Sequence, residues 1–296
     1  MVRMGHDDLK DVRFSLPEPG PVIELTSLEG IIRRGGRKEF LPAQRLDFDL
    51  LYRVESGTTV HQVDFVSHQL GPGDALWVRA GQVHRWGEIS DLSGRVVIFP
   101  PHAISPDTQA ILAALGFGSS FPRKNRWSAS ELSATGAASA WFSLASEDTL
   151  GGNPTARTRL RDAALSALLI RLASAGPTLE SSGTAAGHSS VFRTFRAAVD
   201  AQFRTVRAAS DYARMLGWST KTLTRVAAEN GTTPKTVIDD RVVLEAKRLL
   251  IHTDASVAQI GAAIGFNDSS NFSSFFRLRA GVTPGVFRTD NGGQPL

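Results

Sequence analysis

The 296-residue chain contains no cysteine. Disulfide bonds, cysteine nucleophiles, thiolate-bound metals and iron–sulfur clusters are therefore excluded within it. Its hydrophobic runs are short, and none approaches the roughly 20 residues that a membrane-spanning helix needs. The N-terminal residues are polar and lack the apolar segment of a secretory signal. These absences predict a cytoplasmic protein that does not bind a membrane.

Charge is distributed unevenly along the chain. The net charge is +4, and a content of 42% hydrophobic and 21% charged residues is typical of a folded globular protein. From Ser189 to Leu296 there are 14 basic and 9 acidic residues, whereas the preceding part has nearly equal numbers of each. A basic region beside a neutral one favours a polyanion such as nucleic acid as its partner, although a solvated basic surface gives the same counts.

The length of the chain favours two domains. We predict the boundary at residues 177–190, which are rich in Gly, Ser and Thr and lack hydrophobic periodicity, as in a flexible linker. Residues 1–176 then form a first domain and residues 191–290 a second. Ahead of the linker, Ala156–Ala175 has the apolar stripe of an amphipathic helix. That stripe suits packing on its own domain or contact with a second copy in a homodimer.

The central part of the first domain has the pattern of β-strands. In residues 46–54 every second side chain is apolar, which predicts a strand with one buried face. Further short strands are expected at 60–65, 75–78 and 95–99, separated by turns that contain glycine, a spacing typical of an antiparallel sandwich or barrel. From about residue 104 to 175 the pattern becomes helical.

A short motif in this domain indicates a particular kind of barrel. The stretch Gly73-Asp-Ala-Leu-Trp-Val-Arg-Ala-Gly-Gln-Val-His84 resembles the second motif of the cupin superfamily, although Arg79 stands where proline is usual. Metal-binding cupins add an earlier motif with two histidines and a glutamate, but the chain has no His-x-His pair. Because a metal centre needs about three converging ligands, we expect neither a metal nor another cofactor.

A barrel of this size can hold one small ligand among its interior side chains. The candidates for contacting such a ligand are aromatic residues and histidines of the β-rich region: Tyr52, His61, Trp77, His84 and Trp86. These groups would suit an apolar or aromatic molecule, or a sugar.

The last third of the chain contains a degenerate internal repeat. Leu216-Gly-Trp218 in the first copy corresponds to Ile264-Gly-Phe266 in the second, and a further glycine and proline follow each at similar distances. In each copy a short helix is expected to end at the glycine, which adopts positive φ easily. Ser219 and Asp268 are then suitable N-caps for a second helix. Each copy therefore has the organisation of a helix-turn-helix.

A long helix is expected between the two copies, at Val237–His252. Its length of about 24 Å would hold the copies a fixed distance apart. Because successive major grooves on one side of DNA lie about 34 Å apart, the second helices of the two copies are predicted to enter neighbouring grooves. These patterns together predict an α+β chain: an N-terminal cupin-like β-barrel with a helical extension, and a C-terminal all-α domain with two helix-turn-helix motifs.

The C-terminal region resembles the DNA-binding domain of AraC/XylS-family transcriptional regulators. The residues that carry the resemblance are Arg241, Leu244–Leu250, Val257–Ile260, Gly265–Asp268, Asn271–Phe272, Phe275–Arg277, Gly281–Pro284 and Phe287–Arg288. Two departures are Gly261, where alanine is usual, and Ala227, where many members have phenylalanine. The resemblance implies a regulator, more commonly an activator, in which a small-molecule effector changes how domains or subunits pack on promoter DNA. It also implies contact with RNA polymerase.

By position in the family motif, exposed residues of the second helix in each copy would contact double-stranded DNA. They are Lys221, Thr222, Thr224 and Arg225 in the first copy, and Ser269, Ser270, Asn271 and Ser274 in the second, with Arg277, Arg279 and Arg288 further along for phosphate contacts. An arginine can pair with guanine through two hydrogen bonds, which makes Arg225 a strong candidate for reading a base.

Two other functions stay open on the sequence. One is a metal-free cupin enzyme joined to a DNA-targeting module, against which the missing His-x-His pair counts. The other is a DNA-binding protein that needs no ligand. This function would be favoured if no metabolite stabilised or altered the barrel domain.

Overall fold

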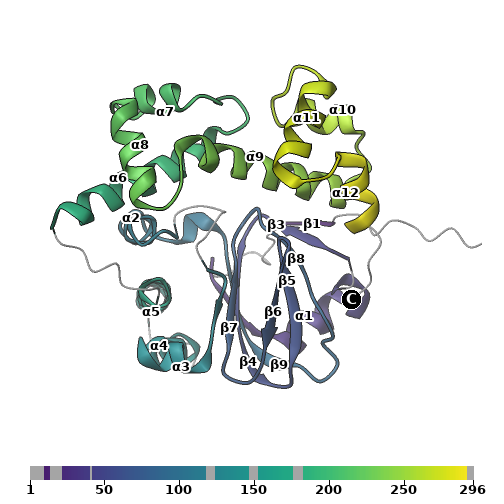
Figure 1. Cartoon of the computed structure of the whole chain (residues 1–296). Coiled ribbons are helices and arrows are strands. Elements are labelled where there is room, and N and C mark those ends of the chain that lie inside the picture. The colour runs from purple at the N-terminus through teal and green to yellow at the C-terminus, as the bar shows by residue number, and fades with distance from the viewer. Residues whose placement is uncertain are drawn as a thin grey trace, which may run out of the picture. The chain divides into compact units, whose positions relative to one another are not determined.

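The computed structural model describes residues 10–13, 22–40, 42–117, 124–146, 153–175 and 183–291. Contacts divide the chain into two units, of which one spans Lys10–Leu179 and the other contains Glu180–Leu296. The first combines strands with helices and the second is helical (Figure 1), so the predicted α+β class is confirmed. No helix among the described residues has the length and hydropathy to cross a membrane.

Two five-stranded sheets form the centre of the first unit. The first sheet has the strand order β1 (Lys10–Val12), β3 (Gln44–Leu46), β8 (Val83–Arg85), β5 (Thr59–Val63) and β6 (Val66–Leu70). The second has the order β10 (Arg126–Trp127), β7 (Ala75–Val78), β4 (Asp49–Ser56), β9 (Ser93–Phe99) and β2 (Glu24–Ser27). Neighbouring strands are antiparallel except β1 and β3.

The predicted cupin-like barrel is an open one, made of two facing sheets, because no strand pairing among the described residues joins them. The strand predicted at residues 46–54 is divided between the sheets, since the chain leaves β3 after Leu46 and enters β4 at Asp49. The prediction of its buried face is confirmed nevertheless: Leu46, Phe48, Leu50, Tyr52 and Val54 all lie in the core between the sheets. The alternation of buried and outward-facing side chains therefore continues from β3 into β4, although the two strands belong to different sheets.

Helices cover the outer face of the second sheet. They are α2 (Pro106–Ala114), α3 (Ala129–Ala134), α4 (Ala137–Ser146) and α5 (Pro154–Ser174), whereas α1 (Leu28–Gly35) and the short η1 (Arg37–Phe40) add to the core between the sheets, and η2 (Pro101–Ala103) precedes α2. The predicted helical region 104–175 is corrected at one place, because β10 pairs with β7 there. Trp127 of β10 is fully buried, and its Nε1 donates to the Leu172 carbonyl at 2.8 Å.

The amphipathic helix predicted at Ala156–Ala175 corresponds to α5. Its residues Leu165, Leu168, Leu169 and Leu172 are at most 1% exposed and pack in the core of their own unit. Burying a leucine contributes roughly 1.5–3 kcal/mol, so this stripe is a main attachment of the helical layer to the sheet. The leucine stripe therefore packs on its own domain, and a contact with a second copy would have to use another face.

The second unit consists of seven described helices: α6 (Gly183–Gln202), α7 (Ala209–Met215), α8 (Thr220–Glu229), α9 (Pro234–His252), α10 (Val257–Ala263), α11 (Ser269–Ala280) and α12 (Pro284–Asn291). The linker predicted at residues 177–190 is corrected, because α6 already begins at Gly183; residues 177–182 lie outside the described part. No proline follows Gly183 before Gln202, so the helix that buries Phe195 and Val199 extends toward its N-terminus without interruption.

Both predicted helix-turn-helix motifs are present, at the two ends of α9 (Figure 1). α7 and α10 end just before Gly217 and Gly265, whose φ angles are +70° and +91°. The predicted N-caps are confirmed: the Ser219 side chain accepts from the Thr222 amide at 3.0 Å, and Asp268 Oδ1 accepts from the Asn271 amide at 2.7 Å. α9 begins three residues before the predicted Val237, because Thr233 caps it and Pro234 is favourable in its first turn.

Candidate functional site

The outer face of α8 carries most of the predicted DNA contacts of the first motif. Lys221, Thr224 and Arg225 are exposed, and their spacing of three and four residues places them on one side of the helix. Leu223, Val226 and Ala227 are buried on the opposite side. The Thr224 hydroxyl donates to the Thr220 carbonyl at 3.0 Å, which leaves its oxygen able to accept from a base.

Thr222 has a different role in the structure from the other three. It is half-buried, and its hydroxyl lies 2.8 Å from that of Ser219, the N-cap of α8. Its backbone amide also donates to Ser219. Thr222 therefore stabilises the N-cap of the recognition helix, and the other three predicted contacts place one hydroxyl and two cations on its outer face.

The corresponding face of α11 has no cation in its first two turns. Ser269, Ser270, Asn271 and Ser274 are all exposed, as predicted. The side-chain amide of Asn271 donates to the N-cap Asp268, which keeps a carboxylate at the start of this helix. A carboxylate repels phosphates, so α11 is less suited than α8 to close approach of the DNA backbone.

Three arginines were assigned to phosphates by sequence, and the structure separates them. Arg277 is exposed on α11. Arg279 forms an ion pair with the buried Asp239 of α9. Arg288 of α12 donates to the carbonyl oxygens of Leu250 at 2.9 Å and Ala255 at 2.6 Å. The guanidinium groups of Arg279 and Arg288 therefore fasten α11 and α12 to α9, which corrects their assignment. The phosphate contact of Arg277 stays a prediction.

A buried ionic network joins α6 to α9, and sequence reasoning missed it. Glu245 is 4% exposed and contacts Arg204 at 3.1 Å, Arg241 at 3.1 Å and Arg248 at 3.5 Å. Arg241 also pairs with Asp200 of α6 at 2.6 Å. The sequence does contain a signal for this network, since Glu245 lies four residues after Arg241 and three before Arg248 on one helix. Such spacings occur more often on solvent-exposed helix faces, so the pattern alone did not indicate a buried network.

Four of the five predicted ligand contacts meet between the two sheets. The Tyr52 hydroxyl lies 3.2 Å from His61 Nδ1, and His61 Nε2 lies 2.9 Å from His84 Nδ1. The Trp86 ring stands edge-on to His61, with 4.6 Å between the ring centres. All four side chains are at most 5% exposed. His68, which the sequence reasoning did not select, lies directly opposite His61 across the β5–β6 pair.

Trp77 does not join this cluster. It lies on the outer face of the second sheet, in the core beneath the helices, where its Nε1 donates to Asp49 Oδ1 at 2.7 Å. Arg79 pairs with the same carboxylate at 2.7 Å and lies 4.2 Å from the centre of the Trp77 ring. Because side chains alternate along a strand, Leu76 and Val78 face the other sheet and Trp77 cannot.

The two buried histidines are uncharged near neutral pH. Burial lowers the pKa of His61 well below its ordinary value, and the neighbouring His84 and His68 lower it further. Burial also lowers the pKa of His84 to about 3. The Nε2 atom of His84 is buried and has no hydrogen-bond partner among the described residues. The chain of polar atoms thus ends in a nitrogen able to bond to an added group.

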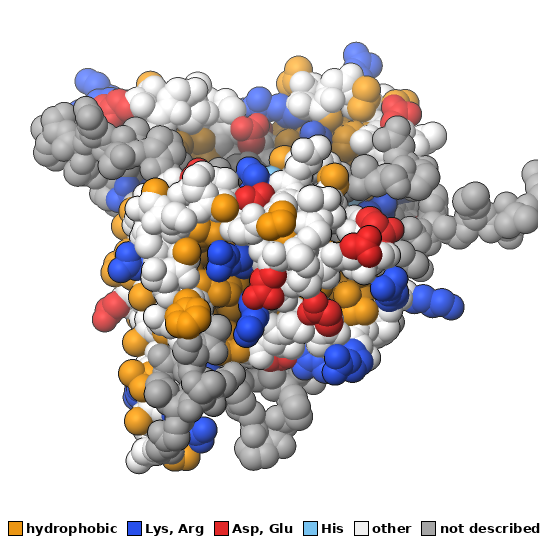
Figure 2. Space-filling view, turned by 90° about the horizontal axis from the view of Figure 1, so that it is seen from below, with side chains coloured by type: hydrophobic (Ala, Val, Ile, Leu, Met, Phe, Trp, Pro, Cys, Tyr) orange, Lys and Arg blue, Asp and Glu red, His pale blue; other side chains and the backbone are white. Residues whose placement is uncertain are grey.

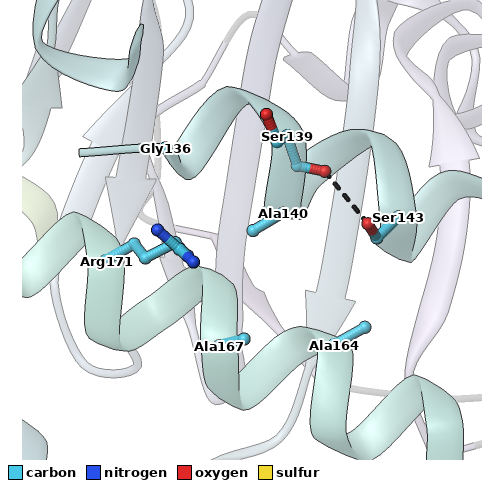
Figure 3. Close-up of a pocket in the computed structure, with 7 residues that line it drawn as sticks. All are labelled: Gly136, Ser139, Ala140, Ser143, Ala164, Ala167 and Arg171. Atoms are coloured by element: carbon cyan, nitrogen blue, oxygen red, sulfur yellow. Dashed lines mark hydrogen bonds between the residues drawn. The ribbon is translucent and has the colours of Figure 1, made fainter. Parts of the chain in front are cut away.

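Two surface pockets lie elsewhere in the first unit. One, of about 300 Å³, is a groove between α4 and α5 with small residues along it and Arg171 reaching toward Gly136 at one end (Figure 3). The Arg171 guanidinium donates to the Thr135 carbonyl at 2.9 Å. The other, of about 360 Å³, lies beside β2 and β9, and Trp141 is among its lining residues. Within the described ranges, no three His, Asp or Glu side chains are grouped so as to hold a metal.

Comparison with known proteins matches both units. The family described as "AraC-like ligand binding domain" matches residues 25–173, and the "Helix-turn-helix domain" family matches residues 212–290. The transcriptional activator RhaS of Shigella sonnei is 26% identical over 261 residues, which is 85% of this chain and 89% of that protein. The transcriptional activator NphR of a Rhodococcus species is 35% identical over 82 residues, 28% of this chain and 24% of NphR, so the chain spans about a quarter of that relative.

Among solved structures, an AraC-type transcriptional regulator from Chromobacterium violaceum is 28% identical, with 38% of this chain and 99% of that one covered and a TM-score of 0.34. The family match over the first unit alone spans half of the chain, and the second match covers both helix-turn-helix motifs. The chain therefore belongs to the AraC family of transcriptional regulators, which are DNA-binding proteins with a ligand-binding domain and not enzymes.

Proposed function

We propose that this regulator reads promoter DNA with α8 and α11 together, and that α8 supplies the main contacts to bases. The observation that carries the proposal is the pair of capped recognition helices at the two ends of one rigid helix, α9. On α8, Lys221 and Arg225 offer donors for guanine, and the Thr224 hydroxyl accepts. On α11 the exposed serines and Asn271 offer short, uncharged contacts, with Arg277 on a phosphate.

A selection from a random pool of duplex DNA tests this proposal. The full chain is used at near-physiological salt, because phosphate contacts alone give strong binding without sequence preference at low salt. We expect two short enriched blocks about one helical turn apart. A pool without any enriched sequence would contradict the proposal.

Replacing Arg225 isolates the base contact. Arg225→Ala is expected to weaken binding to the selected duplex by roughly 10- to 100-fold, because a two-bond contact with guanine is worth about 1–3 kcal/mol of discrimination. Binding is measured by fluorescence anisotropy. Arg214→Ala is the matched control, because Arg214 is an exposed arginine of α7 in a surface ion pair with Asp211. An equal loss on an unrelated duplex would show that Arg225 contacts only phosphate.

We further propose that a small-molecule effector binds between the sheets, in a cupin-like site formed by Tyr52, His61, His84 and Trp86. Aromatic rings surround the hydrogen-bonded chain, which ends at the Nε2 of His84, an atom without a hydrogen-bond partner in the described part of the protein. Because both histidines are neutral, the site favours an uncharged molecule with a hydroxyl or carbonyl group on an apolar, aromatic or sugar framework.

A thermal-shift screen of uncharged sugars and aromatic metabolites tests the effector site. A ligand at 100 times its Kd stabilises the folded state by about 2.7 kcal/mol, which raises the midpoint of unfolding measurably. The rise is expected to disappear in His84→Leu. An unchanged rise in that variant would place the ligand elsewhere, and a panel without any hit would favour a regulator that needs no ligand.

We also propose that the protein is a homodimer through the outer face of α4 and α5. The leucine stripe of α5 is used within its own unit, but Phe142 is 72% and Leu160 is 47% exposed. Hydrophobic side chains gather on the side of the molecule where these helices lie (Figure 2), and such patches mark interaction sites. Phe142→Asp is expected to turn a dimer into a monomer in sedimentation velocity; a wild-type chain that is monomeric at micromolar concentration would refute this contact.

Activation through RNA polymerase is the final element of the proposal. RhaS and NphR are both named transcriptional activators. In transcription assays with purified polymerase and a promoter carrying the selected site, the protein is expected to raise the amount of transcript. An unchanged or lower amount would indicate a repressor.

A further inference from the structure

The loop that leads into the first helix-turn-helix motif touches the second motif directly, in addition to the connection of the two motifs through α9. The loop between α6 and α7 passes against the turn between α10 and α11. A Cβ atom placed on Gly265 would lie 1.9 Å from the carbonyl oxygen of Arg204. The backbone of this loop is therefore in contact with the turn of the second motif, and Gly265 is required for the approach as well as for its φ of +91°.

Arg207 reinforces this contact with its side chain. Its Nη2 donates to the carbonyl oxygen of Ile264, the C-cap residue of α10. The guanidinium carbon lies 4.5 Å from the centre of the Phe266 ring, in the geometry of a cation–π contact. The side chain is half-buried, and burial lowers the pKa of Arg207 while the nearby Asp239 opposes the shift. Arg207 thus holds the turn of the second motif at two points.

The contact reaches the second recognition helix through Phe266. The Phe266 ring lies 5.4 Å from that of Phe272 and 5.2 Å from that of Phe275, both of which belong to α11. Phe272 is fully buried. A movement of Phe266 would therefore shift the start of α11, where the predicted base contacts lie.

The other end of the contact is fixed to the first motif. Arg207 lies two residues before α7, and the hydroxyl of Tyr212 in α7 donates to the Val206 carbonyl at 3.2 Å. Tyr212 is fully buried and its ring meets that of Phe195 edge-on at 5.6 Å. The loop that carries Arg207 is therefore held by the core of the first motif.

We propose that Arg207 is a positioning residue for DNA recognition, which sets the orientation of α11 relative to α8. A single helix fixes the distance between two motifs at its ends, but a second contact away from its axis is needed to fix their rotation. The Arg279–Asp239 ion pair attaches α11 to α9 itself. The contact through Arg207 is the second contact, and it lies away from the axis of α9. The inference rests on the proposed reading of DNA by both helices.

Three duplexes test the inference. They carry both selected blocks at their natural spacing, both blocks with one or two base pairs added between them, and one block with the other replaced by unrelated sequence. The full chain is compared as wild type, Arg207→Ala, Arg207→Lys and the control Arg214→Ala, with affinities from fluorescence anisotropy. Thermal unfolding of each variant shows that it is folded.

Arg207→Ala is expected to lose about tenfold or more in affinity for the natural two-block duplex, because linked sites gain affinity only when both engage at once. Its affinity for the single-block duplex is expected to stay within about twofold of wild type, and its preference for the natural spacing to flatten. Arg207→Lys keeps the charge but loses the planar contact with Phe266, and is expected to behave like Arg207→Ala. The affinities of Arg214→Ala are expected to match those of the wild type on all three duplexes.

Two results would overturn the inference. Equal losses on the single-block and two-block duplexes would show that Arg207 supports only the stability of the domain. Full affinity and spacing preference in Arg207→Lys would show that Arg207 acts through its charge, as a phosphate contact does. Failure of the wild type to select two blocks would instead contradict the proposed function, so the two outcomes are distinguishable.

Discussion

Glu245→Gln is expected to lower the free energy of unfolding of the helical unit by about 3–5 kcal/mol, the usual cost of removing one partner from a buried ion pair. Glu245 is 4% exposed, and its carboxylate is the shared partner of Arg204, Arg241 and Arg248. Arg248 is 1% exposed. Glutamine keeps the size of the side chain but removes the negative charge beside the buried guanidinium groups of Arg241 and Arg248, although Arg241 keeps its pair with Asp200.

Urea unfolding followed by circular dichroism measures this loss, and hydrogen exchange of peptides from α9 assigns it to the helical unit. Asp211→Asn is the matched control. It removes the carboxylate of a surface pair, 2.6 Å from Arg214, in which both side chains are exposed, and such pairs contribute about 0–1 kcal/mol. Similar small losses in both variants would show that the Glu245 network contributes little to stability.

The same variant is expected to abolish binding to the selected duplex near its unfolding temperature and to weaken it below that temperature. α9 carries a recognition motif at each end. Near its centre, Glu245 pairs with Arg204 in the loop after α6 and with Arg241, which in turn pairs with Asp200 of α6. Loosening that junction releases the helix on which both motifs depend. Stability and DNA binding should therefore fall together in Glu245→Gln, whereas Arg225→Ala should lose only binding.

Lowering the pH from 7 to 5 is expected to lower the free energy of unfolding of the first unit, which contains the two sheets, by about 2 kcal/mol through His84 alone. An unfolded histidine has a pKa of about 6.5, whereas burial lowers the pKa of His84 to about 3. Between these two values the unfolded state binds more protons than the folded state, so stability rises with pH. The contribution is complete above about pH 6.5 and is lost progressively as the pH falls toward 3.

His61 adds to the loss in the same direction, because burial and its histidine neighbours lower its pKa well below the ordinary value. Urea unfolding at several pH values measures the slope. Comparison of wild type with His84→Gln isolates the histidine, since other groups titrate as well, and His102→Gln provides a matched control near the surface. The explanation fails if the slope between pH 7 and 5 is the same in wild type and His84→Gln.

The helix-turn-helix motifs were predictable because their signals are local. A glycine that ends one helix and a serine or aspartate that caps the next lie within four residues of each other, and they define each turn without reference to the rest of the chain. The leucine stripe of α5 and the buried face of residues 46–54 were predictable for a similar reason, since periodicity reports which side of an element is apolar. The N-terminal start of α6 was not, because a Gly- and Ser-rich composition resembles a linker even where a helix extends into it.

Among the candidate site residues too, those set by local sequence were predictable and those that depend on distant contacts were not. Lys221, Thr224 and Arg225 were identified by their place in a local motif, and all three are exposed on α8. Trp77 was assigned to the wrong face of the sheet, because its strand is buried on both sides and composition alone does not tell the two faces apart. The roles of Arg79, Arg207 and Arg279 were missed, because their partners are 30 or more residues away in sequence.

The sequence by itself determined the two-part organisation, the tandem recognition helices and the absence of cysteine chemistry, because composition, caps and periodicity depend on neighbouring residues. Only the tertiary structure decided that residues 46–54 serve two sheets, that Tyr52, His61 and His84 form one buried chain, and that Arg207 joins the two motifs. Those features arise when segments far apart in the chain exclude water from the same place, where a hydrogen bond or an ion pair gains strength from the low dielectric constant around it.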